Sequence, residues 1–135
     1  MKEIYFNVPL EIKESVKNVK NFLKSKKPLH GPGINIKQIK EEVSKKLGLK
    51  NIFLTNSCTS ALEICSLAIN LKTSDEVIVP SFAFITTASS FARTGCTIKF
   101  CDIEKETLMP SLKDITNCIT KKTKAIVIVH YQGYS

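Results

Sequence analysis

The stretch "DEVIVPSFAFITTASSFARTGCTIKFCDIE", residues 75–104, decides the fold of this chain. It begins with the β-rich apolar run "EVIVP" (76–80) and ends around a second such run, "TIKFC" (97–101), while residues 83–94 between them suit a helix. Two strands joined through one helix predict a right-handed β-α-β crossover, in which the strands lie parallel in one sheet.

The same alternation continues on both sides of this stretch. A strand is expected over 51–55 and a helix over 60–70, and further along the chain a helix over 111–119 and a strand over 124–130. The last strand contains "AIVIV", which is apolar on both faces, as in strands that are covered on both sides. The sequence therefore predicts an α/β fold with a mostly parallel sheet flanked by helices.

Two lysine-rich amphipathic helices are expected ahead of this region. Residues 11–27 and 35–47 each carry apolar residues at spacings of three and four. The turn "HGPG" (30–33) separates them, because its glycines allow unusual backbone angles and its proline fixes one. We therefore expect an N-terminal helical segment over 1–50 and a partial α/β domain over 51–135.

The net charge of +8 does not indicate a nucleic-acid partner. Residues 1–50 contain 12 lysines against 5 acidic residues, whereas the remaining 85 residues carry a surplus of only one positive charge. Arg93 is the only arginine, and arginine is the residue best suited to bidentate contacts with phosphates and bases. Lysine-covered faces of the two expected helices explain the charge, so no nucleic acid is expected as a partner.

The sequence also bears on where in the cell the protein is expected. No apolar run approaches the roughly 20 residues of a membrane helix, and the N-terminus lacks the apolar core of a signal peptide. We therefore expect a cytoplasmic protein with no membrane partner. The five cysteines are odd in number and form no C-x-x-C pair, so neither a disulfide framework nor a metal site is expected.

The stretch "NSCTSALE" (56–63) places small polar and thiol side chains at the start of the helix expected over 60–70. The first N–H groups of a helix have no intrahelical partner and carry the positive end of its dipole, so they suit an anion such as phosphate. Ordinary capping is the alternative, with Ser60 and Glu63 as an S-x-x-E capping box. The local sequence leaves both interpretations open, although no P-loop or G-x-G-x-x-G fingerprint is present.

Two aromatic residues follow the strand over 76–80. Phe82 and Phe84 lie in the next loop or first helical turn, at the same sheet edge as the possible anion site. An exposed aromatic face there could stack on a flat ligand ring, whereas a core position for Phe84 is the alternative. A thiol enzyme is a further alternative, with Cys58 as the nucleophile and His130 as its base.

These segments together resemble the DegT/DnrJ/EryC1/StrS family of pyridoxal 5'-phosphate (PLP)-dependent sugar-nucleotide aminotransferases. The motifs "SCTSALE" and "AIVIVHYQGYS", with the stretch 75–104 between them, occur in the order and spacing of that family. The resemblance implies the N-terminal part of the large domain of the aspartate aminotransferase type I fold. Residues 51–135 would then be part of a PLP-binding large domain.

The resemblance also implies cofactor-binding residues. The backbone N–H groups of Thr59 and Ser60, with the Thr59 hydroxyl, would hold the phosphate of PLP. Cys58 stands beside them at a position that is glycine in many relatives. Phe84 matches the aromatic residue that stacks on the pyridine ring.

The implied reaction transfers an amino group from L-glutamate to the 4-keto carbon of a dTDP-sugar such as dTDP-4-keto-6-deoxyglucose, in bacterial surface polysaccharide synthesis by a homodimer. Transamination also needs a lysine for proton transfer and an acid beside the pyridine nitrogen. In the family both lie beyond residue 135, so no catalytic residue is expected in this chain. We expect the front part of a longer enzyme that is inactive alone, with a non-catalytic truncated product as the alternative.

Overall fold

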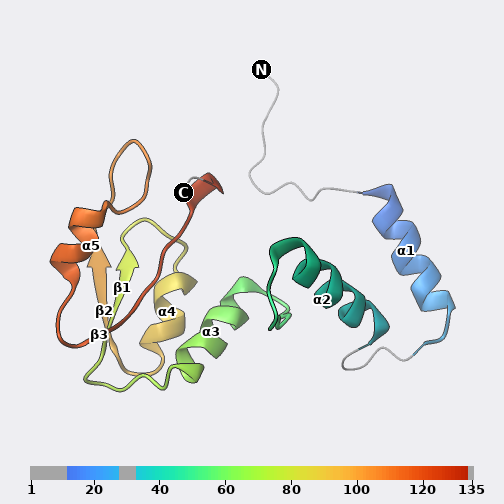
Figure 1. The fold of residues 1–135 in the computed structure, drawn as a ribbon, viewed down its shortest axis with the longest axis horizontal. Coiled ribbons are helices and arrows are strands. Elements are labelled where there is room, and N and C mark those ends of the chain that lie inside the picture. Colours follow the sequence, from blue (N-terminus) through green and yellow to red (C-terminus); the bar gives the residue numbers. More distant parts are fainter. Residues whose placement is uncertain (1–11, 28–32, 134–135) are drawn as a thin grey trace. The chain divides into compact units, whose positions relative to one another are not determined.

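The computed structural model describes residues 12–27 and 33–133, which fall into two compact units. The first unit ends at Leu54 and the second begins at Thr55. Each unit has its own secondary structure (Figure 1), and the second contains the sheet.

The first unit consists of two helices, α1 (Lys13–Lys24) and α2 (Ile34–Leu47). Both match the expected helices within a few residues, and α2 ends at Gly48, whose φ of +67° is the left-handed geometry that favours glycine. Neither helix buries a residue: Val16 and Leu23, on the apolar stripe of α1, are more than half exposed. The turn expected at 30–33 lies, apart from Gly33, outside the described residues.

The second unit is an α/β unit with a wholly parallel three-stranded sheet. Its elements are α3 (Cys58–Ala68), β1 (Glu76–Pro80), α4 (Thr86–Ala92), β2 (Thr97–Cys101), α5 (Leu112–Cys118), β3 (Thr123–Ile126) and a 3-10 turn (Tyr131–Gly133). The strand order is β2-β1-β3, and Val77 of β1 pairs with Ile98 on one side and Ala125 on the other. The β-α-β crossover predicted from residues 75–104 is confirmed, and β1 and β2 have the expected bounds.

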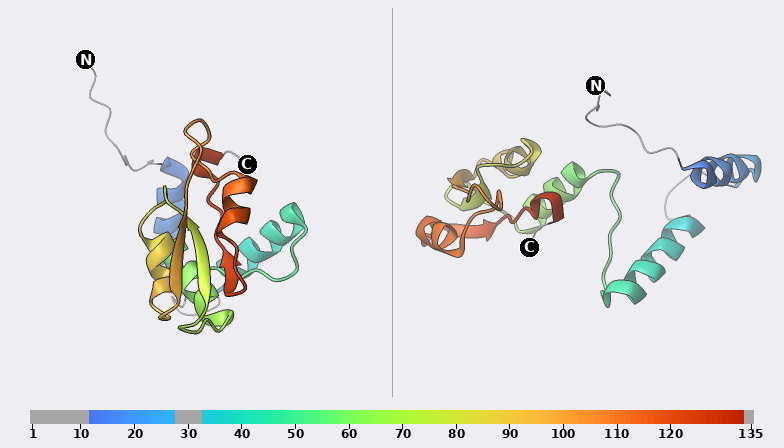
Figure 2. Two further views of the ribbon diagram at one scale, coloured as in Figure 1. Left: turned by 90° about the vertical axis from the view of Figure 1, so that its left-hand side faces the viewer. Right: turned by 90° about the horizontal axis from the view of Figure 1, so that it is seen from above.

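Helices cover both faces of this sheet, as Figure 2 shows with α4 and α5 on opposite sides of the strands. On the face of α3 and α4, the central side chains Val77 and Val79 of β1 are fully buried. They pack in a core of buried and partly buried residues: Leu62, Leu71, Ala88, Phe91, Cys96, Ile98, Ala125 and Val127. Ile78 faces the other side, where α5 contacts β2, and is 1% exposed. Burial of this central strand supplies the hydrophobic stabilisation of the unit.

The strand expected over 51–55 is absent. These residues form no strand, and Phe53 is 86% exposed. A β-strand satisfies its backbone groups only beside another strand, and within the described residues these five pair with none of the three strands of the sheet. The expected strand over 124–130 is shorter and spans Thr123–Ile126, where it pairs with β1.

No helix within residues 12–27 and 33–133 combines the length and apolar character needed to span a bilayer.

Candidate cofactor site

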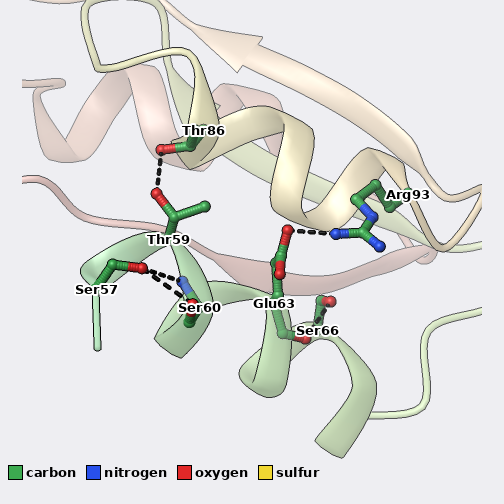
Figure 3. A network of polar contacts seen from close by, with 7 residues as sticks. All are labelled: Ser57, Thr59, Ser60, Glu63, Ser66, Thr86 and Arg93. Carbon is green, nitrogen blue, oxygen red and sulfur yellow. Dashed lines mark hydrogen bonds and ion pairs between the residues drawn. The ribbon is translucent and has the colours of Figure 1, made fainter. Parts of the chain in front are cut away.

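The candidate site lies at the carboxyl edge of the sheet, where β1 ends and α3 and α4 begin. In a β-α-β unit a helix that packs against parallel strands starts at their carboxyl ends, so the starts of α3 and α4 meet there. Thr59 of α3 and Thr86 of α4 make this junction: their side-chain hydroxyls form a hydrogen bond of 3.1 Å (Figure 3). Both residues are half-buried.

Ser57 is the N-cap of α3. Its backbone is extended, with φ −157° and ψ 158°, and its Oγ accepts a hydrogen bond from the Ser60 N–H at 3.0 Å. The Ser57 carbonyl then accepts the first helical hydrogen bond, from the Ala61 N–H at 3.2 Å. Ser57 Oγ and Ser60 Oγ are also 3.0 Å apart. The Ser57 side chain therefore occupies the Ser60 N–H, one of the amides expected to bind the phosphate.

The start of α3 is capped, as the alternative interpretation had it, but by Ser57 and not by a box of Ser60 and Glu63. Glu63 forms an ion pair with Arg93, the residue that follows α4 (Figure 3). The reason is the start of the helix: with Ser57 as the N-cap, Ser60 is the third residue of α3 and Glu63 the sixth, too far along for its carboxylate to reach back to the cap.

The four predicted cofactor-binding residues fall into two groups at this edge. Cys58, Thr59 and Ser60 form the first turn of α3; Cys58 is exposed, and the other two are half-buried. Phe84 lies in the loop between β1 and α4 and is 75% exposed, so the alternative of a core position for this ring is wrong. The structure brings the first three together, and the Thr59–Thr86 bond connects their helix to the segment that follows Phe84.

The donors of this edge suit a phosphate group. The first turn of α3 contains no acidic residue, and the N–H groups of Cys58 and Thr59 lie where a helix supplies no acceptor. The positive end of the helix dipole adds to their attraction for an anion. The Ser60 N–H and the Thr59 hydroxyl already donate, to Ser57 and Thr86, so a bound phosphate would replace those two acceptors.

Phe84 lines an apolar cavity of about 240 Å³ beside the same strand ends. Its other walls include Pro80, Ala88 and Phe100, the last of which is 61% exposed. Flat apolar walls of this kind suit an aromatic ring. The chemistry of the residues therefore suits each part of PLP, the α3 amides its phosphate and the apolar walls beside Phe84 its ring.

Two residues at this edge were not predicted from the sequence. Thr86 bonds to Thr59, and Tyr131 packs on Phe82 with ring centroids 4.8 Å apart and planes tilted by 55°. The signal that could have found both is their position at the carboxyl ends of strands, Thr86 after β1 and Tyr131 after β3.

The cysteines differ sharply in their surroundings. Cys58 and Cys65 are exposed, whereas Cys96 and Cys101 are buried. Burial, with the nearby Cys118 thiol, raises the pKa of Cys101 from its ordinary 9.0 to about 11, which makes this thiol a poor nucleophile. Within the described ranges, no three His, Cys, Asp or Glu side chains gather as a metal site would require.

Solved structures similar to this chain include sugar aminotransferases. The putative sugar aminotransferase Spr1654 from Streptococcus pneumoniae, in its PMP form, matches with a TM-score of 0.86 and 27% identity over 99% of this chain and 33% of that chain. The same protein matches in its PLP form. The fold class is therefore confirmed as the α/β fold of PLP-dependent sugar aminotransferases.

Comparison with curated sequences identifies the family of the chain. The spore coat polysaccharide biosynthesis protein SpsC of Bacillus subtilis is 34% identical over 96% of this chain and 33% of its own length. A dTDP-4-dehydro-2,3,6-trideoxy-D-glucose 4-aminotransferase of Saccharopolyspora spinosa is 33% identical over 76% of this chain and 27% of its own length. The DegT/DnrJ/EryC1/StrS aminotransferase family matches residues 9–135, and the chain belongs to this family. It spans about a third of the length of these relatives.

Proposed function

We propose that this chain forms the phosphate-binding and ring-stacking part of the PLP site in a sugar-nucleotide aminotransferase. The observation that carries the proposal is the junction of the two helix starts, which places the Thr59 hydroxyl and the α3 amides at the edge that also carries Phe84. Family membership and the likeness to Spr1654 in its PLP and PMP forms support it.

Each group has a distinct task in this proposal. The amides of Cys58 and Thr59 and the Thr59 hydroxyl bind the phosphate, and the Ser60 N–H joins them when it leaves Ser57 Oγ. The exposed ring of Phe84 contacts the pyridine ring and keeps water from one of its faces. The bound cofactor supplies an electron sink through which an amino group moves between an amino acid and a keto sugar.

The proposed substrates are L-glutamate as donor and a 4-keto-6-deoxy sugar nucleotide such as dTDP-4-keto-6-deoxyglucose as acceptor. This is the activity of a dTDP-4-amino-4,6-dideoxygalactose transaminase, which serves bacterial surface polysaccharide synthesis. The names of the two sequence relatives support a dTDP-linked 4-keto sugar and a polysaccharide pathway. We place the reaction in the cytoplasm and in a homodimer.

The anchoring lysine is proposed to lie outside these 135 residues. The chain contains 19 lysines, but none stands at the position that the family resemblance assigns to the lysine. The chain alone is therefore proposed to bind the cofactor phosphate without carrying out transamination. A full-length protein would supply the lysine and the acid beside the pyridine nitrogen.

Binding of pyridoxamine 5'-phosphate (PMP) tests this proposal directly. PMP carries an amine in place of the aldehyde of PLP, so it cannot react with the surface lysines, and its fluorescence or heat of binding reports the site alone. We expect PMP to bind the 135-residue chain at least about tenfold more tightly than pyridoxamine, which lacks the phosphate, because charge-assisted hydrogen bonds contribute about 1.5–3 kcal/mol.

Two matched variants localise the binding. Thr59→Val keeps the shape of the side chain and removes its hydroxyl, and it should lower the preference for PMP while leaving the part that the α3 amides supply. Phe84→Ala should weaken PMP and pyridoxamine alike, because both ligands have the ring. Equal affinity of the unaltered chain for both ligands would contradict the proposed site, and amination of dTDP-4-keto-6-deoxyglucose by the chain alone would contradict its proposed inactivity.

A further inference from the structure

We propose that Thr86 is a positioning residue for phosphate binding: it holds the Thr59 hydroxyl at the start of α3 and supplies the hydrogen bond that lets Thr59 donate to the phosphate. This inference rests on the proposed function, because it assigns a role to a residue beside the phosphate site.

The contact is specific and connects two elements. Thr59 Oγ1 and Thr86 Oγ1 are 3.1 Å apart although the residues are 27 positions apart in sequence, and both side chains are half-buried (Figure 3). Threonine is stiff about its first side-chain torsion, because two heavy atoms on Cβ leave few allowed rotamers. Two such side chains in contact hold each other's hydroxyl oxygen in place.

Counting protons shows what Thr86 contributes. Each hydroxyl has one proton to donate and two lone pairs that accept. In this structure Thr59 donates its proton to Thr86. A phosphate oxygen accepts hydrogen bonds, so Thr59 must turn its proton toward the phosphate to bind it. Thr86 can then rotate its own O–H and donate to the lone pair of Thr59, so the pair keeps its hydrogen bond with the donor and acceptor exchanged.

Thr86 also belongs to the segment that carries the aromatic ring. It is the first residue of α4, two positions after Phe84, and the Thr87 N–H donates to the Phe84 carbonyl at 2.8 Å. One residue therefore contacts the phosphate donor and shares a hydrogen-bonded turn with the stacking residue. Loss of its hydroxyl should affect the phosphate contact specifically, because that turn uses only backbone groups.

The test compares PMP with pyridoxamine on the unaltered chain and on position 86 variants. Thr86→Val keeps the branched shape and removes the hydroxyl, and we expect it to lower PMP affinity by about tenfold while leaving pyridoxamine affinity unchanged. Thr86→Ser keeps the hydroxyl and should stay within about threefold of the unaltered chain. Thr86→Ala, which also lacks the hydroxyl, takes the place of Thr86→Val if circular dichroism shows that the valine variant is unfolded.

A double variant shows whether Thr86 acts through Thr59. In a Thr59→Val background, Thr86→Val should cause no further loss of PMP affinity, because the group it positions is already gone. An equal loss in both backgrounds, or a loss that is the same for PMP and pyridoxamine, would overturn the proposed role. If the unaltered chain itself shows no preference for PMP, the proposed function fails first, and the role of Thr86 fails with it.

Discussion

Replacing Ser57 by alanine is expected to destabilise the α/β unit and to free the Ser60 amide at the same time. Ser57 Oγ is the N-cap acceptor, 3.0 Å from the Ser60 nitrogen. Loss of such a cap costs about 1 kcal/mol. Because Ser57 is exposed, water replaces the lost acceptor, so the cost should not reach the larger penalty of a buried unpaired group.

Urea unfolding followed by circular dichroism measures this change, and amide hydrogen exchange locates it. A loss of about 1 kcal/mol corresponds to roughly a fivefold change in an equilibrium constant, so amides that exchange only through unfolding of the unit should exchange about fivefold faster in Ser57→Ala. The Ser60 amide loses its acceptor in the folded state and should exchange faster still. The same substitution should not weaken PMP binding, since it removes the acceptor that competes with phosphate for this N–H. Stability and phosphate affinity are therefore expected to respond differently to one change.

Ser60→Ala is the matched control. It keeps the Ser60 N–H and loses only the exposed contact between the two hydroxyls, so its unfolding free energy should change by less than about 0.5 kcal/mol. A larger loss for Ser60→Ala than for Ser57→Ala would refute the assignment of the cap and restore the capping box at Ser60 and Glu63. A loss of PMP affinity in Ser57→Ala would refute the competition between Ser57 and phosphate.

Four further substitutions or treatments have clear expected outcomes. Gly95 has φ +83°, and an added Cβ would lie 3.0 Å from Thr73 Cγ2. Gly95→Ala should therefore lower the unfolding free energy by about 1–3 kcal/mol. Val79 is 0% exposed, so Val79→Ala should lower the free energy of unfolding, measured with urea, by about 2 kcal/mol. Val16 is 55% exposed, and Val16→Ala should lower it by less than about 0.5 kcal/mol. Iodoacetamide at neutral pH should modify Cys58 and Cys65 rapidly and Cys101 only after unfolding, as mass spectrometry of the labelled peptides would show. Because the folded pKa of Cys101 is raised from 9.0 to about 11, the folded chain binds more protons than the unfolded chain in that window, so stability should fall as pH rises through it, and Cys101→Ala should flatten the fall.

The position of the candidate site could be predicted because it depends on a topological rule. Parallel strands joined by helices have all their carboxyl ends at one edge, so the order of strands and helices along the sequence is enough to place Thr59 and Phe84 at the same edge. Their hydrogen-bond partners could not be predicted in this way. Thr86 is 27 residues from Thr59, and only the packing of α4 on α3 brings the two hydroxyls within 3.1 Å.

The sequence by itself determined those helices and strands that depend on short-range patterns of residues. The strands at 76–80 and 97–101 have the expected bounds, and α2 ends at Gly48, because apolar periodicity and a left-handed glycine act within a few residues. The tertiary structure alone decided which groups pair. Residues 51–55 have the composition of a strand but form none, because a strand needs a neighbouring strand. Glu63 pairs with Arg93, a residue 30 positions away that only the packing of α4 on α3 brings within reach.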